Sequence, residues 1–226
     1  NRKVVENQFV EKDGKWTVDW ADFEEKLKEV DLFILCSPHN PLGIVWTEEE
    51  LRRMMNLCLQ YRVPVVSDEI HSDLIFHGKK HIPTATLSPE IAANVITGIS
   101  GTKTFNLAGL QTSNIFVPND QLRAQFMDFM LCSSANPKCN ILGYKACELA
   151  YNHCGEWLKE CISVINRNKE VVTSFLAEHF PQIKVCELQA TYLLWMDWNG
   201  LGLDYKELER INHEEARLFF DEGYVF

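Results

Sequence analysis

The 226-residue chain has no excess of basic residues, because 22 lysines and arginines stand against 32 aspartates and glutamates, for a net charge of −10 at pH 7. The basic residues form neither a cluster nor a stripe, so we expect no nucleic-acid partner. No apolar stretch approaches the ~18 to 20 residues that cross a bilayer, and residue 1 does not open a signal peptide. We therefore expect no membrane partner and a cytoplasmic location.

Paired cysteine motifs are also missing. The eight cysteines show no C-x-x-C spacing and are scattered through segments with strand and helix patterns, which favours reduced thiols over disulfides or a zinc site. The sequence has no internal repeat, low-complexity segment or flexible linker. It does have a hydrophobic content of 46%, which is enough for a substantial core in one large or two small domains.

Three short apolar runs, at residues 31–36, 63–67 and 95–100, predict buried strands. Between the first two, Thr47 and Glu50 form a capping box that predicts the start of a helix. The apolar face of this helix would consist of Leu51, Met54, Met55, Cys58 and Leu59. The intervening helix makes the strands parallel neighbours, whereas a strand at residues 112–117 follows too soon for a parallel crossover and is predicted to be antiparallel.

Three polar motifs directly follow the three parallel strands: SPHNPLG at residues 37–43, SDEIH at residues 67–71 and SGTK at residues 100–103. Open α/β sheets bind ligands at the carboxyl ends of their strands, so we expect Asn40, Asp68 and Lys103 to converge there. An amide, a carboxylate and an amine on neighbouring loops are the groups that a pyridoxal phosphate ring needs. The motifs therefore predict an α/β fold with a pyridoxal 5'-phosphate site.

Each of these three residues has an expected role. Lys103 would form an imine with the pyridoxal aldehyde and, once displaced by the substrate, would remove the Cα proton as the catalytic base. Asp68 would pair with the protonated pyridine nitrogen, and Asn40 would hydrogen-bond the phenolic oxygen of the ring. The simpler alternatives are a solvated loop lysine, a helix cap and an Asn-Pro turn.

Three further residues are expected near the cofactor. Ser100 and Thr102 would offer hydroxyl groups to the phosphate, and His71 would stand near the ring oxygen or the substrate. Ordinary loop hydroxyls and a packed histidine remain open alternatives. His77 and His81 are spaced like a metal pair, but no third ligand accompanies them, so we expect no metal.

The rest of the chain predicts further helices and a second domain. We expect helices from Asp120 to about residue 131, from Pro137 to about residue 152, over residues 155–179, and over residues 205–222, with strands at 183–187 and 192–198. Residues 1–158 would belong to a large cofactor-binding domain, and residues 159–226 to a connecting helix and part of a smaller domain. Residues 2–8 have the pattern of a strand that began before residue 1, and residues 223–226 have the pattern of a strand that would continue beyond residue 226. We therefore expect the chain to be a piece of a longer protein.

The segments LCSPHNPLG (35–43), VSDEIH (66–71) and SGTKTFNLAGL (100–110) resemble the class I/II aminotransferase superfamily of pyridoxal phosphate fold type I. More narrowly, they resemble its MalY/PatB branch of cystathionine β-lyases and C-S lyases. Aminotransferases commonly have a tyrosine where this chain has His71 and a phosphate-binding arginine where it has Gln111. The segment ATYLLWMD (190–197) resembles a small-domain strand of the same branch.

The resemblance implies a mixed, mostly parallel sheet in a large domain, part of a smaller α/β domain, and a homodimer. It implies β-elimination from a sulfur amino acid such as cystathionine or cysteine, with release of a thiol, pyruvate and ammonia. A complete member would also supply a phosphate-binding glycine turn, an aromatic residue stacked on the ring, a tyrosine from the partner subunit and an arginine for the substrate carboxylate, which this chain lacks. An aminotransferase and a non-catalytic fragment are the alternatives.

Overall fold

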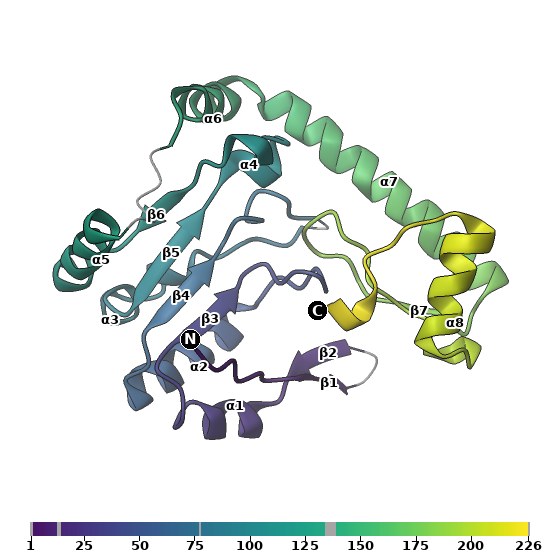
Figure 1. Ribbon diagram of the computed structural model, residues 1–226, viewed down its shortest axis with the longest axis horizontal. Helices are drawn as coiled ribbons and strands as arrows, with labels where there is room; N and C mark the ends of the chain where they lie inside the picture. Colours follow the sequence, from purple (N-terminus) through teal and green to yellow (C-terminus); the bar gives the residue numbers. More distant parts are fainter. Residues whose placement is uncertain (1, 13–14, 77, 134–138, 226) are drawn as a thin grey trace.

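The computed structural model describes residues 2–12, 15–76, 78–133 and 139–225. A four-stranded sheet organises the larger part of the molecule (Figure 1), and its strands lie in chain order: β3 (Phe33–Cys36), β4 (Val65–Asp68), β5 (Val95–Ile99) and β6 (Asn114–Phe116). β3, β4 and β5 are parallel and β6 is antiparallel to β5, which confirms the predicted mixed sheet.

Helix α2 (Glu48–Tyr61) connects β3 to β4 in the chain and provides much of the hydrophobic core. It begins as predicted, because the Thr47 side chain accepts a hydrogen bond from the Glu50 amide and the Glu50 carboxylate accepts one from the Thr47 amide. Its fully buried residues are Leu51, Met54, Met55 and Cys58. Leu59, predicted on the same face, is only partly buried at its edge.

An antiparallel hairpin, β1 (Phe9–Lys12) and β2 (Lys15–Val18), precedes helix α1 (Trp20–Lys26). The strand predicted over residues 2–8 is wrong, because pairing begins only at Phe9 and residues 2–8 have no regular secondary structure. A strand needs a neighbour for its backbone hydrogen bonds, and within the described ranges no strand pairs with residues 2–8.

Short helices connect β4, β5 and β6, and long helices follow them. The short helices are η1 (Thr84–Thr86), α3 (Pro89–Ala92), α4 (Gly101–Thr104) and η2 (Ala108–Leu110). The long helices are α5 (Asp120–Cys132), α6 (Ile141–His153) and α7 (Gly155–His179). α5 begins at Asp120 as predicted, and Asn119 caps it, because the Asn119 side chain accepts hydrogen bonds from two amides of the first turn. The predicted start of α6 at Pro137 lies outside the described residues, and the described helix is capped by Asn140.

α7 runs from the end of the molecule that holds α6 to the end that holds the carboxyl-terminal elements (Figure 1). These are β7 (Lys184–Val185), β8 (Met196–Asp197), η3 (Asn199–Leu201), α8 (Tyr205–Arg210), η4 (Ile211–Ala216) and η5 (Gly223–Val225). β7 and β8 pair antiparallel but are shorter than predicted. The domain division at residue 158 stays a prediction and falls within α7.

The helix predicted over residues 205–222 is only partly correct. α8 stops at Arg210, one π-helical turn follows, and Arg217 ends it in the left-handed conformation with φ of +55°. Residues 217–222 then leave the helix, and Gly223 opens a 3₁₀ turn where a strand was predicted. Within the described ranges, none of the helices combines the length and the apolar character needed to cross a bilayer. The eight cysteines carry free thiols.

Candidate functional site

The register of the sheet brings the three motifs to one edge. Asp68, the last residue of β4, is paired with Cys36 on one side and with Gly98 on the other. Asn40 follows Cys36 by four residues and Lys103 follows Gly98 by five. Asn40 therefore lies on the loop after β3 and Lys103 on the short segment after β5, both beside the carboxyl end of β4, as predicted from the order of strands and motifs.

Asn40 is held in a tight loop. The His39 amide donates to the Ile44 carbonyl at 2.8 Å, the Gly43 amide donates to the His39 carbonyl at 2.8 Å, and the Asn40 amide donates to Cys36 Sγ at 3.3 Å. These bonds fix the backbone but leave the side chain free. Its Oδ1 is buried without a hydrogen-bond partner among the described residues. A buried polar atom in this state normally has a ligand or water as its partner.

His71 lies on the loop after Asp68 and is 3% exposed. Its Nδ1 is buried without a partner in the described chain, and its ring meets Tyr192 edge-on with centroids 5.6 Å apart. Burial lowers the pKa of His71, the positive charge of Lys103 lowers it further, and the negative charge of Asp68 opposes the shift. The imidazole is therefore neutral near pH 7, and the influence of both charges reflects how near they lie.

Lys103 is on α4, a helix of four residues that begins at its N-cap Ser100. The Ser100 hydroxyl accepts from the Thr102 amide at 3.1 Å, donates to the Thr112 carbonyl at 2.6 Å, and lies 2.6 Å from the Thr102 hydroxyl. Lys103 is half-buried, whereas its α4 neighbours are buried. The Ser100 hydroxyl thus serves as a cap, and phosphate binding by Ser100 and Thr102 stays a prediction.

The chain segment 188–191 was not predicted to contribute, yet it joins two of the motif loops. The amides of Gln189 and Ala190 both donate to the Gly43 carbonyl at 3.0 Å. On the other side, the Gln189 carbonyl accepts from the Phe76 amide at 2.8 Å, and the Thr191 amide donates to the Leu74 carbonyl at 2.9 Å. The only signal in the sequence was the family-like segment at residues 190–197.

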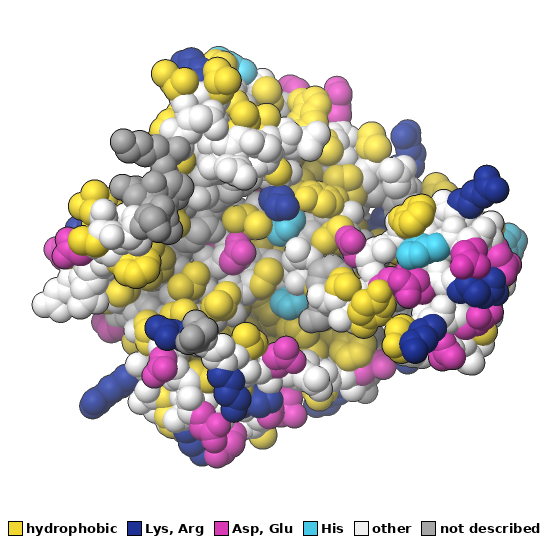
Figure 2. Space-filling view, viewed as in Figure 1, with side chains coloured by type: hydrophobic (Ala, Val, Ile, Leu, Met, Phe, Trp, Pro, Cys, Tyr) yellow, Lys and Arg dark blue, Asp and Glu magenta, His cyan; other side chains and the backbone are white. Residues whose placement is uncertain are grey.

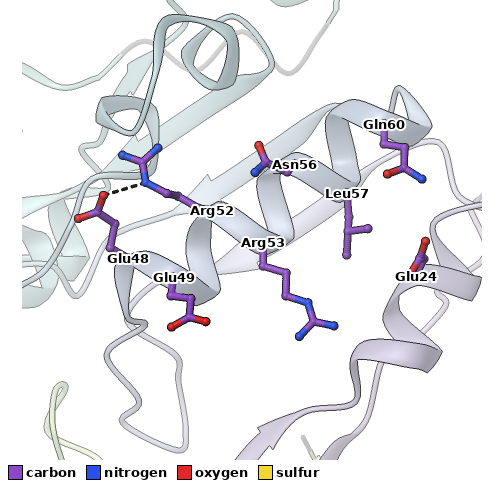
Figure 3. A pocket seen from close by; sticks show the side chains of 8 residues that line it. All are labelled: Glu24, Glu48, Glu49, Arg52, Arg53, Asn56, Leu57 and Gln60. Atoms are coloured by element: carbon purple, nitrogen blue, oxygen red, sulfur yellow. Dashed lines mark hydrogen bonds and ion pairs between the residues drawn. The ribbon is translucent and has the colours of Figure 1, made fainter.

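The face that contains this edge is concave. Figure 2 shows a hollow in the middle of the molecule, between the carboxyl ends of the parallel strands and the carboxyl-terminal elements, with hydrophobic side chains on its floor. A second, separate groove lies between α1 and α2 (Figure 3), and none of the three motifs lines it. Its arginines are already engaged, Arg52 with Glu48 at 2.7 Å and Arg53 over the Trp20 ring at 4.2 Å. We therefore place the functional site at the sheet edge.

Comparison with known proteins identifies relatives along the whole chain. The family model for aminotransferase class I and II matches residues 3–225. Cystathionine beta-lyase PatB of Bacillus subtilis is 40% identical over 224 residues, which are 98% of this chain and 58% of that protein. Protein MalY of Escherichia coli is 30% identical over 230 residues, which cover 100% of this chain and 58% of MalY. This chain thus spans about 58% of the length of these relatives.

Solved structures give the same result. Cystalysin from Treponema denticola, which contains a pyridoxal 5'-phosphate cofactor, is similar with a TM-score of 0.95 and 38% identity, covering 99% of this chain and 57% of cystalysin. The pyridoxal phosphate-bound C-S lyase from Staphylococcus hominis has a TM-score of 0.87 and 28% identity, covering 96% of this chain and 56% of the lyase. The expected fold and the resemblance to the MalY/PatB branch are confirmed.

Proposed function

Because this chain belongs to the aminotransferase class I and II family, we propose that it binds pyridoxal 5'-phosphate at the carboxyl edge of β3, β4 and β5. The observation that carries the proposal is the sheet register that gathers Asn40, Asp68 and Lys103 at this edge. The fit of the cofactor is supported by two buried polar atoms without partners among the described residues, Asn40 Oδ1 and His71 Nδ1. A polar aromatic ring would supply the missing hydrogen bonds.

Each of the site residues would have its own role in binding pyridoxal phosphate or in the reaction. Asp68 would keep the ring nitrogen protonated, Asn40 would hydrogen-bond the phenolic oxygen of the ring, and neutral His71 would stand near the ring oxygen or the substrate. Ser100 and Thr102 would reach the phosphate. When bound, the cofactor supplies an electron sink for the negative charge that develops at the substrate Cα. Lys103 would hold the cofactor through its aldehyde group, and when the substrate amine takes the place of Lys103, the free Lys103 amine would take the proton from Cα.

We propose that the reaction is β-elimination on a sulfur amino acid of the cystathionine or cysteine type. The Lys103 amine would take the proton from Cα, the electron pair of the Cα–H bond would form a Cα=Cβ double bond, and the Cβ–S pair would leave on the sulfur as a thiolate. The thiolate would become the thiol by taking up the proton held by Lys103. Hydrolysis of the remaining fragment yields pyruvate and ammonia. The 40% identity to a cystathionine beta-lyase supports this choice, as does the presence of His71 and Gln111 where aminotransferases commonly carry tyrosine and arginine.

A second reaction is possible on the same residues. In an aminotransferase, Lys103 would return the proton to the cofactor instead of leading to loss of the thiol, and a keto-acid acceptor would be needed to complete turnover. The family model that matches this chain is named for aminotransferases of class I and II. Release of pyruvate from cystathionine without any keto acid distinguishes the lyase.

We further propose that the protein is a cytoplasmic homodimer with a large domain over residues 1–158 and part of a smaller domain over residues 159–226. Large exposed apolar side chains on β6 and α5 support an association surface: Ile115, Phe116, Met127, Phe129 and Leu131. Light scattering of the purified protein would measure its mass in solution. A monomer at all concentrations would contradict the dimer.

Borohydride reduction followed by peptide mapping tests the cofactor site. After incubation with pyridoxal phosphate, the pyridoxyl label should appear on Lys103, and the Lys103→Ala variant should lose it. Where the unaltered protein forms pyruvate from cystathionine, the Lys103→Ala variant should form none. Label on a different lysine at the site, with Lys103 unmodified, would refute the assignment.

A further inference from the structure

We propose that Asp73 is a positioning residue for Lys103, because its carboxylate joins α4, which carries Lys103, to the loop after β4 and to α6. This inference rests on the proposed function, in which the Lys103 amine reacts. Asp73 lies two residues beyond His71, and Thr104 directly follows Lys103. Asp73 and Tyr151 lie outside the segments that resemble the family, and Thr104 lies within residues 100–110 without an expected role of its own.

One oxygen makes the connection. The Thr104 hydroxyl donates to Asp73 Oδ2 at 2.8 Å, and the Tyr151 hydroxyl donates to the same oxygen at 2.9 Å. Thr104 is 2% exposed, so its hydrogen bond is shielded from water. Asp73 therefore holds together three segments that are 31 and 78 residues apart in sequence.

The protonation of Tyr151 suits this arrangement. Burial raises the pKa of Tyr151 well above its usual range, and the hydrogen bond and negative charge of Asp73 raise it further. The phenol therefore keeps its proton near neutral pH and acts as a donor to the Asp73 carboxylate. A hydrogen bond from a neutral hydroxyl to a charged acceptor is stronger than one between two neutral groups.

The tyrosine ring also limits where α4 can lie. A Cβ added at Gly101 would lie 2.8 Å from Tyr151 Cε2, so the backbone of α4 approaches the ring as closely as a glycine allows. At the carboxyl end of α4, the Phe105 ring meets the Tyr151 ring edge-on, with centroids 5.2 Å apart. The centroid of the Phe105 ring also lies 6.1 Å from that of the Trp157 ring. α4 thus lies against Tyr151 of α6 at both of its ends and, through its C-cap residue Phe105, also lies near Trp157 of α7.

Such contacts decide the position of α4 because the helix cannot do so itself. A helix of four residues has too few internal hydrogen bonds to be stable alone, so its place depends on tertiary contacts. The position matters for chemistry, since a displacement of about 1 Å at a reacting group costs roughly 100-fold in rate. Loss of the Asp73 bonds should therefore move the Lys103 amine without removing any atom of Lys103.

Matched variants separate this role from simple stability. Thr104→Val and Asp73→Ala remove the donor and the acceptor, whereas Thr104→Ser keeps a hydroxyl and Asp73→Asn keeps an acceptor oxygen. Each protein is incubated with pyridoxal phosphate without substrate and reduced with borohydride at timed intervals. The labelling rate at Lys103 is then measured by peptide mapping relative to that at Lys159, whose side chain is 74% exposed on α7.

We expect the Lys103 to Lys159 labelling ratio to fall about tenfold in Thr104→Val and Asp73→Ala, and to stay within about twofold of the unaltered protein in Thr104→Ser and Asp73→Asn. Thermal unfolding monitors the fold of each variant. If Asp73→Ala does not fold, Thr104→Val, which keeps the side-chain volume, decides the test. A purely structural role would lower the melting temperature and leave the labelling ratio unchanged.

Two outcomes overturn different statements. An unchanged ratio in folded Thr104→Val would overturn the positioning role of Asp73 while leaving the proposed function intact. Absence of label on Lys103 in the unaltered protein would overturn the proposed function and this assignment together.

Discussion

Glu69 Oε2 lies 2.8 Å from His81 Nε2 in the interior of the protein, and Glu69 directly follows Asp68 in the chain. The other carboxylate oxygen, Oε1, accepts hydrogen bonds from the Ser67 hydroxyl at 2.8 Å and from the Thr84 amide at 3.0 Å. Glu69 is 1% exposed. This buried carboxylate therefore ties the end of β4, next to the candidate site, to the segment at residues 81–84.

Replacement of Glu69 by alanine should strongly destabilise the protein. It removes the acceptor for Ser67, Thr84 and His81 and leaves buried polar groups without partners, at a cost of about 3 to 5 kcal/mol in the free energy of unfolding. Urea unfolding at pH 7 measures this change in the free energy of unfolding. Exposed Glu49→Ala on α2 is the control and should change the free energy by less than about 0.5 kcal/mol. A loss below about 1 kcal/mol for Glu69→Ala would contradict the role of the carboxylate.

The stability that Glu69 contributes should depend on pH in a defined direction. Burial would raise the pKa of Glu69, but the hydrogen bonds from His81, Thr84 and Ser67 outweigh it and lower the pKa below its usual 4.5. The contribution is therefore complete above the unfolded pKa and is lost as the pH falls through the lowered folded pKa. Unfolding free energies of the unaltered protein and Glu69→Gln should converge as the pH drops below about 4.5. A difference that grows on acidification would contradict the sign.

Asp68→Asn should reduce activity more than stability. The substitution keeps the size of the side chain and an oxygen that can accept from the Ile70 amide, a bond now 3.2 Å long. It removes the charge that would hold the proton on the ring nitrogen. A charged hydrogen bond is worth about 1.5 to 3 kcal/mol, so pyruvate formation should fall roughly 10- to 150-fold. Urea unfolding without cofactor is the control, and equal turnover in both proteins would exclude the proposed role.

Thr47→Ala should weaken α2 from its first turn. The Thr47 hydroxyl accepts from the Glu50 amide at 3.2 Å, and loss of such an N-cap costs about 1 kcal/mol. Thr47→Ser keeps the hydroxyl and should restore most of the loss. Urea unfolding of both variants measures the difference, and equal stabilities for alanine and serine would show that the hydroxyl contributes nothing.

Gly43→Ala should disturb the contact between the Asn40 loop and segment 188–191. Gly43 has φ of +67°, and an added Cβ would lie 2.7 Å from Leu188 Cδ1 and 2.9 Å from the Ala190 carbonyl oxygen. Strain of this kind costs about 1 to 3 kcal/mol. Gly109→Ala is the matched control, since its Cβ would meet no atom within 4 Å. Similar unfolding free energies for the two variants would contradict the close approach.

Local patterns in the sequence determined the elements around the site. The capping box of Thr47 and Glu50 and the apolar period of α2 act within one or two turns, so they form wherever the helix lies. The short spacing before β6 required an antiparallel strand. The convergence of Asn40, Asp68 and Lys103 also followed from the chain, because parallel strands joined by crossovers bring their carboxyl ends to one edge.

Contacts between distant segments were decided only by the tertiary structure. The bond of Asp73 to Tyr151 spans 78 residues, and that of Glu69 to His81 joins two loops whose sequences carry no periodic signal. The end of α8 at Arg210 and the absence of a strand over residues 2–8 were likewise unpredictable, because local propensity does not say whether a partner is present. A hydrogen bond across the fold depends on where two backbones pass each other, and that position results from packing of the whole chain.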